Sequence, residues 1–195
     1  MLYTIKTNLI TEQIINKSRF ITSLIIVRSV EEANEILKQT RKTYYNATHN
    51  CYAYIIGTSQ EHIKYSDDRE PSQTAGIVIY DVLKKQNLTN ILCVVTRYFG
   101  GIKLGSGGLV RAYSSSTAKA LDEAIILPII HKQKLTIKCS YEAYNLIQSY
   151  LKDFELIDSF FTDTVELIYL IPEDDFLSVK ENLTNLTKGE ITIKY

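Results

Sequence analysis

The chain has 195 residues, of which 45% are hydrophobic and 23% charged, and its formal net charge is +0. This length accommodates two small domains, and the composition is typical of a globular protein. No apolar run approaches the roughly 20 residues of a membrane-spanning helix, and the first residues lack the basic start and apolar core of a signal peptide. Three isolated cysteines, Cys51, Cys93 and Cys139, suit a reducing compartment, so we expect a cytoplasmic protein with no membrane partner.

The zero net charge hides an asymmetry between the two halves. Residues 1–128 carry 15 Lys and Arg against 11 Asp and Glu, a net charge of +4, whereas residues 129–195 carry 7 against 11, a net charge of −4. The mildly basic first half can bind a nucleic acid, and only weakly, whereas the acidic second half is not expected to bind one.

Hydrophobic patterning predicts mixed α/β structure in the first half. Ser29 and Glu32 have the spacing of a capping box at the start of a helix. We predict strands at 18–27, 51–57, 62–66 and 91–96, and helices at 29–44, 75–86 and 109–124.

Pro128 marks the predicted domain boundary, which gives domains 1–128 and 129–195. The second half is predicted to follow a βαββαβ order, which is the ferredoxin-like arrangement of a four-stranded antiparallel sheet under two helices. Its predicted elements are strand 134–140, helix 141–154, strands 156–162 and 165–171, helix 173–187 and strand 190–195. The sequence therefore predicts an α+β protein of two domains.

The segment TRYFGGIKLGSGGLVRAY, residues 96–113, holds five of the eight glycines, namely Gly100, Gly101, Gly105, Gly107 and Gly108. A glycine-rich turn between a buried strand and a helix can present main-chain N–H groups to an anion. Neither the Walker motif nor the dinucleotide-binding fingerprint is present. Two interpretations stay open: a phosphate cradle, or glycines that let helix 109–124 pack closely on the sheet.

Cationic and aromatic side chains frame these glycines. Arg97, Lys103 and Arg111 supply positive charge, and Tyr98, Phe99 and Tyr113 supply flat faces. Basic groups interleaved with aromatic rings suit single-stranded or looped RNA, in which bases stack and phosphates need cations. Aromatic residues beside a buried strand also serve core packing, so we expect about half of these rings to point inward.

Two further polar clusters lie in apolar surroundings. His49 and Cys51 alternate along a strand start, but a lone pair of ligands does not hold zinc, so a hydrogen-bonded histidine is favoured over a metal site. Asp67 and its acidic neighbours lie in a polar stretch, where capping of nearby main-chain N–H groups is favoured over acid–base catalysis. We therefore predict no metal, no cofactor and no catalytic residue.

Three segments together resemble the IMPACT (imprinted and ancient) family and its bacterial members. They are ATHNCYAY (47–54), YSDDREPSQTAG (65–76) and, most specifically, VVTRYFGGIKLGSGGLVRAY (94–113). The resemblance implies a first domain similar to the second domain of a small-subunit ribosomal protein and to domain four of elongation factor G. It implies a second domain similar to domain five of that factor.

The family has no established enzymatic activity, and its eukaryotic members regulate translation. This chain departs from the usual family pattern DGEPSGTAGKP, because Arg69 and Gln73 replace glycines and Ile77 and Val78 replace Lys-Pro. If the glycines allow a ligand to approach closely, these replacements alter that approach. If they are turn residues alone, the replacements change little.

Together these observations predict a non-catalytic protein that binds RNA, the ribosome or translation factors through its first domain. The predicted binding residues are His49, Arg97, Tyr98, Phe99, Gly100, Gly101, Lys103, Gly105, Gly107, Gly108 and Arg111. The alternatives are a phosphate- or nucleotide-handling enzyme at the glycine-rich segment, and a protein-interaction regulator without a nucleic-acid role. The sequence does not indicate an oligomeric state.

Overall fold

Apolar runs in the first half of the chain form a five-stranded antiparallel sheet with strand order β2-β3-β6-β4-β5. The computed structural model describes residues 1–194 and divides between Ile129 and Ile130 into two compact units. The first unit contains β1 (Tyr3–Ile5), β2 (Leu9–Ile15), β3 (Ser18–Ile26), α1 (Val30–Thr43), β4 (His49–Ile56), β5 (His62–Ser66), α2 (Gly76–Lys85), β6 (Ile91–Tyr98), α3 (Gly105–Glu123) and β7 (Ile126–Pro128).

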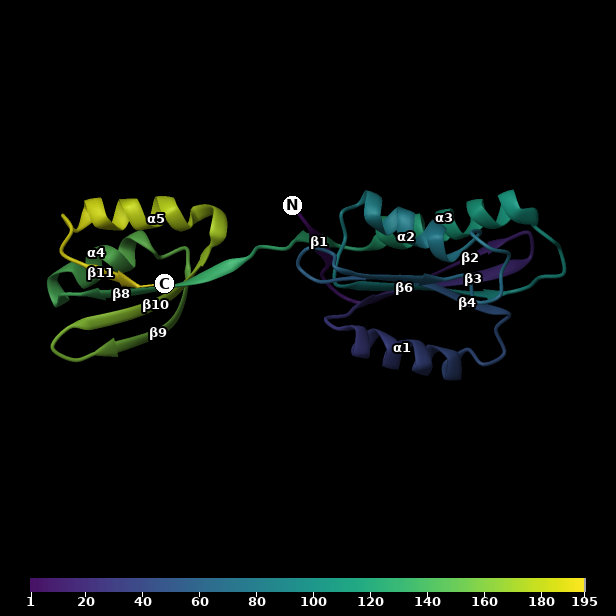
Figure 1. Ribbon diagram of the computed structural model, residues 1–195, viewed down its shortest axis with the longest axis horizontal. Helices are drawn as coiled ribbons and strands as arrows, with labels where there is room; N and C mark the ends of the chain where they lie inside the picture. Colours follow the sequence, from purple (N-terminus) through teal and green to yellow (C-terminus); the bar gives the residue numbers. More distant parts are fainter. Residues whose placement is uncertain (195) are drawn as a thin grey trace. The chain divides into compact units, whose positions relative to one another are not determined.

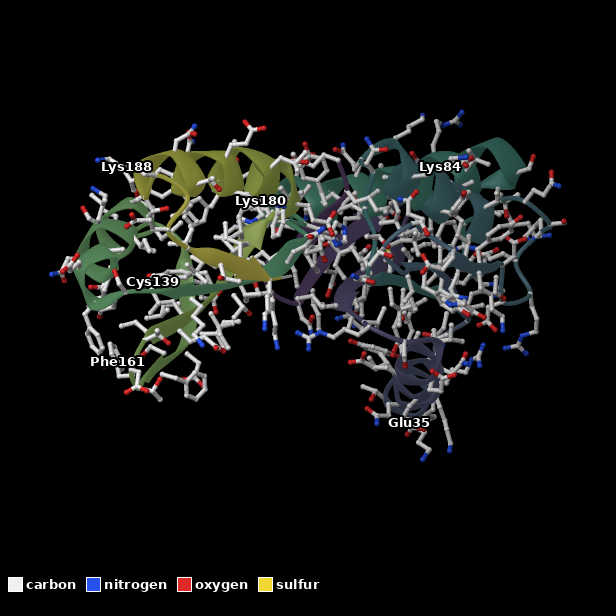
Figure 2. All side chains as sticks on the ribbon, turned by 60° about the vertical axis from the view of Figure 1, so that its left-hand side comes forward. Glu35, Lys84, Cys139, Phe161, Lys180 and Lys188 are labelled. Carbon is white, nitrogen blue, oxygen red and sulfur yellow. The ribbon has the colours of Figure 1, made fainter. Side chains whose placement is uncertain are left out.

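Helices cover both faces of this sheet. α2 and α3 lie on one face and α1 on the other (Figure 1). Lys84 of α2 and Glu35 of α1 accordingly project from opposite sides of the unit (Figure 2). The main hydrophobic core lies between the sheet and the α2–α3 pair, and a smaller core lies under α1.

The predicted capping of α1 is confirmed. The Ser29 hydroxyl accepts a hydrogen bond from the Glu32 main-chain N–H at 3.2 Å. Acidic residues fill the first turn and Arg41 and Lys42 the last turn, which complements the helix dipole. Local sequence therefore specifies both ends of this helix.

Two parts of the first unit differ from the predictions. The strands β1, β2 and β7 were not predicted. β1 and β7 have three residues each and pair with one another, whereas Ile10 and Ile14 of β2 are 63% and 70% exposed and obscure the alternation of apolar and polar residues. The helix α3 begins at Gly105 rather than at residue 109, so three of the predicted loop glycines form its first turn. Glycine's poor helix propensity concealed that turn.

The second unit has the predicted ferredoxin-like topology, with sheet order β11-β8-β10-β9 and all neighbours antiparallel. α4 and α5 lie on one face of its sheet (Figure 1). Its elements are β8 (Lys132–Cys139), α4 (Tyr141–Tyr150), β9 (Glu155–Phe161), β10 (Val165–Pro172), α5 (Glu173–Leu186) and β11 (Thr192–Lys194). The last residue of the predicted strand 190–195 lies outside the described residues.

The protein is thus an α+β chain whose two units each have a hydrophobic core of their own. None of the helices within residues 1–194 combines the length and the apolar character that crossing a membrane requires.

Candidate functional site

The glycine-rich segment joins the end of β6 to the start of α3, and its glycines have different structural reasons. A Cβ at Gly100 would overlap the Lys17 carbonyl of the β2–β3 turn, so close approach of two backbones requires glycine there. Gly101 and Gly105 have φ angles of 87° and 71°, which L side chains rarely adopt. A Cβ at Gly107 would meet only the end of the Arg111 side chain, at 3.8 Å, so neither packing nor φ explains this glycine.

A buried ion pair lies beneath this segment, between the sheet and α3. Arg97 and Glu70 are 5% and 8% exposed, and Arg97 Nη1 donates to Glu70 Oε1 at 2.7 Å. The Tyr113 hydroxyl donates to the same carboxylate oxygen at 2.7 Å. His49 Nε2 lies 3.6 Å from Glu70 Oε2, while its Nδ1–H donates to the Asp68 carbonyl at 2.9 Å. Glu70 thereby links β4, β6 and α3 to the loop that precedes α2.

The predicted hydrogen-bonded histidine is thus confirmed, and the thiol beside it is equally well enclosed. Cys51 Sγ lies 3.0 Å from the Asp67 carbonyl oxygen and 3.3 Å from the Tyr113 hydroxyl. Burial raises the pKa values of both the Cys51 thiol and the Tyr113 hydroxyl well above their ordinary range. At neutral pH both groups stay protonated, and Cys51 is not a nucleophile.

All three thiols are expected to resist modification in the folded protein. Burial raises the pKa of Cys93 to about 12, and it also raises the pKa values of Cys51 and Cys139. Cys139 lies inside the second unit (Figure 2). A disulfide reagent at pH 8 should therefore label no cysteine in buffer and all three in denaturant. The exposed variant Ser72→Cys should label at once, and rapid labelling of the native chain would contradict the burial.

The loop between β5 and α2 is organised by Asp67. One carboxylate oxygen accepts the N–H groups of Ala75 and Gly76 at 3.0 and 2.8 Å, and the other accepts the Gln73 N–H at 2.9 Å. Ala75 is the N-cap of α2 and supplies no side-chain cap, so Asp67 takes over that role from outside the helix. The predicted capping function of this acidic stretch is confirmed.

The two positions at which this chain departs from the family's glycine pattern both have a left-handed backbone conformation. Arg69 has φ 71° and Gln73 has φ 63°, in the same loop that Asp67 organises. Both positions have the backbone conformation that favours glycine, and this chain bears the strain of placing a side chain at each of them.

Restoring either glycine is expected to stabilise the first unit. Arg69→Gly and Gln73→Gly should each raise the free energy of unfolding by about 0.5–1 kcal/mol, because relief of the left-handed strain exceeds glycine's entropy cost. Ser72→Gly, in the same loop without a positive φ, should lower it. Urea denaturation measures all three variants, and stabilisation by Ser72→Gly alone would contradict the assignment.

A cleft opens between this network and the first turn of α3. Its volume is about 290 Å³, and its buried floor includes Arg97, Glu70 and Leu109. Its exposed rim is formed by Thr48, Pro71, Phe99, Lys103, Gly105 and Ser106. No side chain caps the N-terminus of α3, and no acidic residue lies in its first turn. The unpaired main-chain N–H groups there make this end of the cleft electropositive.

The structure divides the predicted binding residues into two groups. His49, Arg97, Phe99, Lys103 and Gly105 line the cleft together. The others lie outside the cleft. Tyr98 contacts Asn46 and Arg19, whereas Arg111 and Gly108 line a neighbouring hollow of about 260 Å³. Neither the cleft nor this hollow is lined by Gly100, Gly101 or Gly107.

Arg97, expected with Lys103 and Arg111 to offer positive charge to a ligand, does not face solvent. Its guanidinium is held inside by Glu70 and lies 5.6 Å from the ring centroids of both Phe20 and Phe99. Tyr113, predicted among the framing rings, is fully buried. Phe99 is 47% exposed, and Lys103 and Arg111 face solvent. Arg97 contributes to the floor of the cleft and not to the solvent-facing surface.

The sequence interpretation missed Glu70 as the centre of the network, although one signal pointed to it. Residues 91, 93, 95 and 97 alternate along β6 and share the face that packs under α3. Arg97 therefore falls on the core face, where an arginine requires a buried acidic partner. Nothing in the local pattern indicates which of the nearby carboxylates that partner is.

Two family models match the chain. The Impact N-terminal domain matches residues 16–121, and a domain of unknown function, DUF1949, matches residues 137–190. The first match contains the whole cleft and its network, and the second lies within the ferredoxin-like unit.

Named relatives match over nearly the full length. The IMPACT family member YvyE of Bacillus subtilis is 39% identical over 94% of this chain and 85% of its own. The IMPACT family member YigZ of Escherichia coli is 31% identical over 92% and 90%. A solved structure described as a hypothetical protein aligns over 98% of this chain and 95% of its own, with a TM-score of 0.66 and 29% identity. With both units covered by family models and with relatives of 31–39% identity over most of the chain, the chain belongs to the IMPACT family.

Proposed function

We propose that the first unit binds single-stranded RNA of the translation machinery and that the protein acts there, in the cytoplasm, without catalysis. The observation that carries the proposal is the group of solvent-facing side chains Phe99, Lys103 and Arg111 around the uncapped start of α3. Neither Lys103 nor Arg111 forms an ion pair with any of the residues 1–194. Both charges therefore remain available to phosphates.

The surface around α3 supports binding of more than one nucleotide. The cleft that contains Phe99 and Lys103 and the hollow that contains Arg111 both include Leu104 in their walls, so they adjoin. A strand that crosses Leu104 can place phosphates beside both cations and stack a base on Phe99. Such contacts read the backbone and the base faces, and they favour a single strand over a duplex.

The buried network supports a binding role over a catalytic one. Glu70 is held by Arg97 and Tyr113, and the Cys51 thiol is protonated and enclosed. These groups are engaged in holding the first unit together. The link to translation is supported by what the family resemblance implies, namely domains similar to those of a ribosomal protein and elongation factor G.

Removing single cations should weaken RNA binding in a salt-dependent way. Lys103→Gln and Arg111→Gln should each lower the affinity for a single-stranded oligoribonucleotide and reduce the slope of log K against log salt by about 0.7, as expected for one phosphate contact. Phe99→Ala should cost about 1–3 kcal/mol of binding free energy through lost stacking. Lys85→Gln, an exposed lysine of α2, is the matched control and should change neither quantity.

Two results would contradict the proposal. One is an RNA affinity that ignores salt and survives both substitutions. The other is a protein partner that stays bound to the full chain after nuclease treatment while no RNA co-purifies, which would favour a protein-interaction regulator. Sedimentation with ribosomes at low and high salt, with and without nuclease, distinguishes these cases.

A further inference from the structure

The sheet of the second unit has one face that no helix of that unit covers, because α4 and α5 both lie on the other face (Figure 1). Alternate residues of β10 from Val165 to Ile171 are buried in the core under these helices, so Ile168 and Leu170 point the opposite way and stay partly exposed. Strand register assigns the remaining residues of this open face. They are Lys132, Lys134, Thr136 and Lys138 of β8, Glu166, Ile168, Leu170 and Pro172 of β10, Glu155, Asp158 and Phe160 of β9, and Thr192 and Lys194 of β11.

Charge divides the open face into two bands of opposite sign. Every charged residue that β8 and β11 contribute to it is a lysine, and every one that β9 and β10 contribute is acidic. Lys132 and Glu155 pair with each other at 2.8 Å. The other charges of the face form no ion pair within residues 1–194, and they are Lys134, Lys138, Lys194, Asp158 and Glu166.

This banded pattern does not suit a polyanion. An RNA strand laid across the lysines would also meet Glu166 and Asp158, whose charges repel phosphates. The pattern suits a surface that carries both signs at the same spacing. The open face of a second copy of the chain is such a surface.

The register of the strands brings the unpaired charges to matching levels. Lys138 lies level with Glu166 on the neighbouring strand. Lys194 lies level with Asp158, because the register runs from Lys194 through Thr136 and Ile168 to Asp158. In a facing copy, a two-fold axis parallel to the strands and midway between β8 and β10 sets β8 over β10 and β11 over β9. Lys138 then faces Glu166 of the second copy and Lys194 faces Asp158 of the second copy, and symmetry forms each pair twice.

The uncharged positions of the open face agree with the same axis. Thr136 faces Ile168 of the second copy, and Leu170 faces the aliphatic part of Lys134. Facing sheets pack about 10 Å apart, a separation that a lysine and a carboxylate span together. An axis running across the strands would instead set lysines against lysines. The charge bands therefore select one of the two symmetric arrangements.

We propose that the open face binds the open face of a second copy of this chain, in a two-fold dimer held by Lys138–Glu166 and Lys194–Asp158 pairs. The inference goes beyond the proposed RNA binding, which concerns the first unit, and does not depend on it. Because the pairs are electrostatic, the dimer should weaken as the salt concentration rises.

The test is sedimentation equilibrium of the full chain over a series of protein concentrations. Lys138→Glu/Lys194→Glu and Asp158→Lys/Glu166→Lys each set like charges opposite one another, and each should weaken self-association about a hundredfold or more. An equimolar mixture of the two variants should recover the dimer, because every position that faces its counterpart then carries the opposite charge. Recovery also shows that both variants are folded.

The matched control changes the net charge by the same amount outside the open face. Lys152→Glu/Lys188→Glu alters two exposed lysines that follow the ends of α4 and α5, and Lys188 lies on the helix side of the sheet (Figure 2). Self-association of this variant should match that of the parent chain.

The remaining outcomes overturn the inference and leave the proposed function standing. A chain that stays monomeric at every concentration and salt level has no such dimer. A dimer that survives both charge reversals is held by another surface, and loss in both variants without recovery in the mixture contradicts the pairing. A monomer that loses RNA affinity through Lys138→Glu/Lys194→Glu and gains it through Asp158→Lys/Glu166→Lys would assign the open face to RNA instead.

Discussion

Replacing Glu70 by alanine is expected to lower the free energy of unfolding of the first unit by about 3–5 kcal/mol, since the change leaves the Arg97 guanidinium buried without a counter-charge. The Tyr113 hydroxyl loses its acceptor at the same time. Because the whole stability of a domain is of the order of 5–15 kcal/mol, this loss approaches unfolding. Urea denaturation followed by circular dichroism measures it.

Two controls define the origin of that loss. Glu123→Ala breaks an exposed ion pair with Lys119 in the same unit and should leave the unfolding midpoint nearly unchanged. The double variant Glu70→Ala/Arg97→Met removes both charges and should recover part of the stability. If Glu70→Ala behaves like Glu123→Ala, Glu70 does not hold the network together.

Replacing Asp67 by alanine is expected to lower the free energy of unfolding by about 2–4 kcal/mol, because three main-chain N–H groups lose their acceptor. Asp67→Asn retains one carbonyl oxygen and should cost less. Asp81→Ala, an exposed position of α2, is the matched control and should have little effect.

The readout for Asp67 can also be local. Amide hydrogen exchange at Gln73, Ala75 and Gly76 should accelerate in Asp67→Ala well before the rest of the unit opens. Uniform acceleration throughout the first unit would instead indicate global destabilisation. Unchanged exchange at these amides would contradict the capping role.

Much of the fold was accessible from the sequence because local signals agreed with it. The run 91–96 is apolar and β-branched, and it became the central strand β6. The second unit follows the predicted βαββαβ order, because short apolar runs such as VELIYLIP of β10 mark its strands in the sequence. The edge strand β2 was not predicted, because its solvent-facing positions include the apolar residues Ile10 and Ile14.

The candidate site was only half accessible, for a physical reason. Lys103, Phe99 and the glycines could be recognised from the sequence, because they lie within one continuous segment. Glu70 comes from a loop 27 residues before Arg97, and only the folded sheet brings the two together. Composition around the glycines suggested that Arg97 faces solvent, yet its position in the strand alternation places it on the core face.

Arg97 therefore stabilises the first unit through its ion pair with Glu70 and also forms part of the floor of the cleft. A lineage that altered this arginine to suit a different ligand would lose the scaffold together with the binding site. Phe99, Lys103 and Ser106 lie at the exposed rim, where substitutions are expected to cost little folding stability. We therefore expect relatives that bind different partners to differ in the residues of the rim and to share those of the floor.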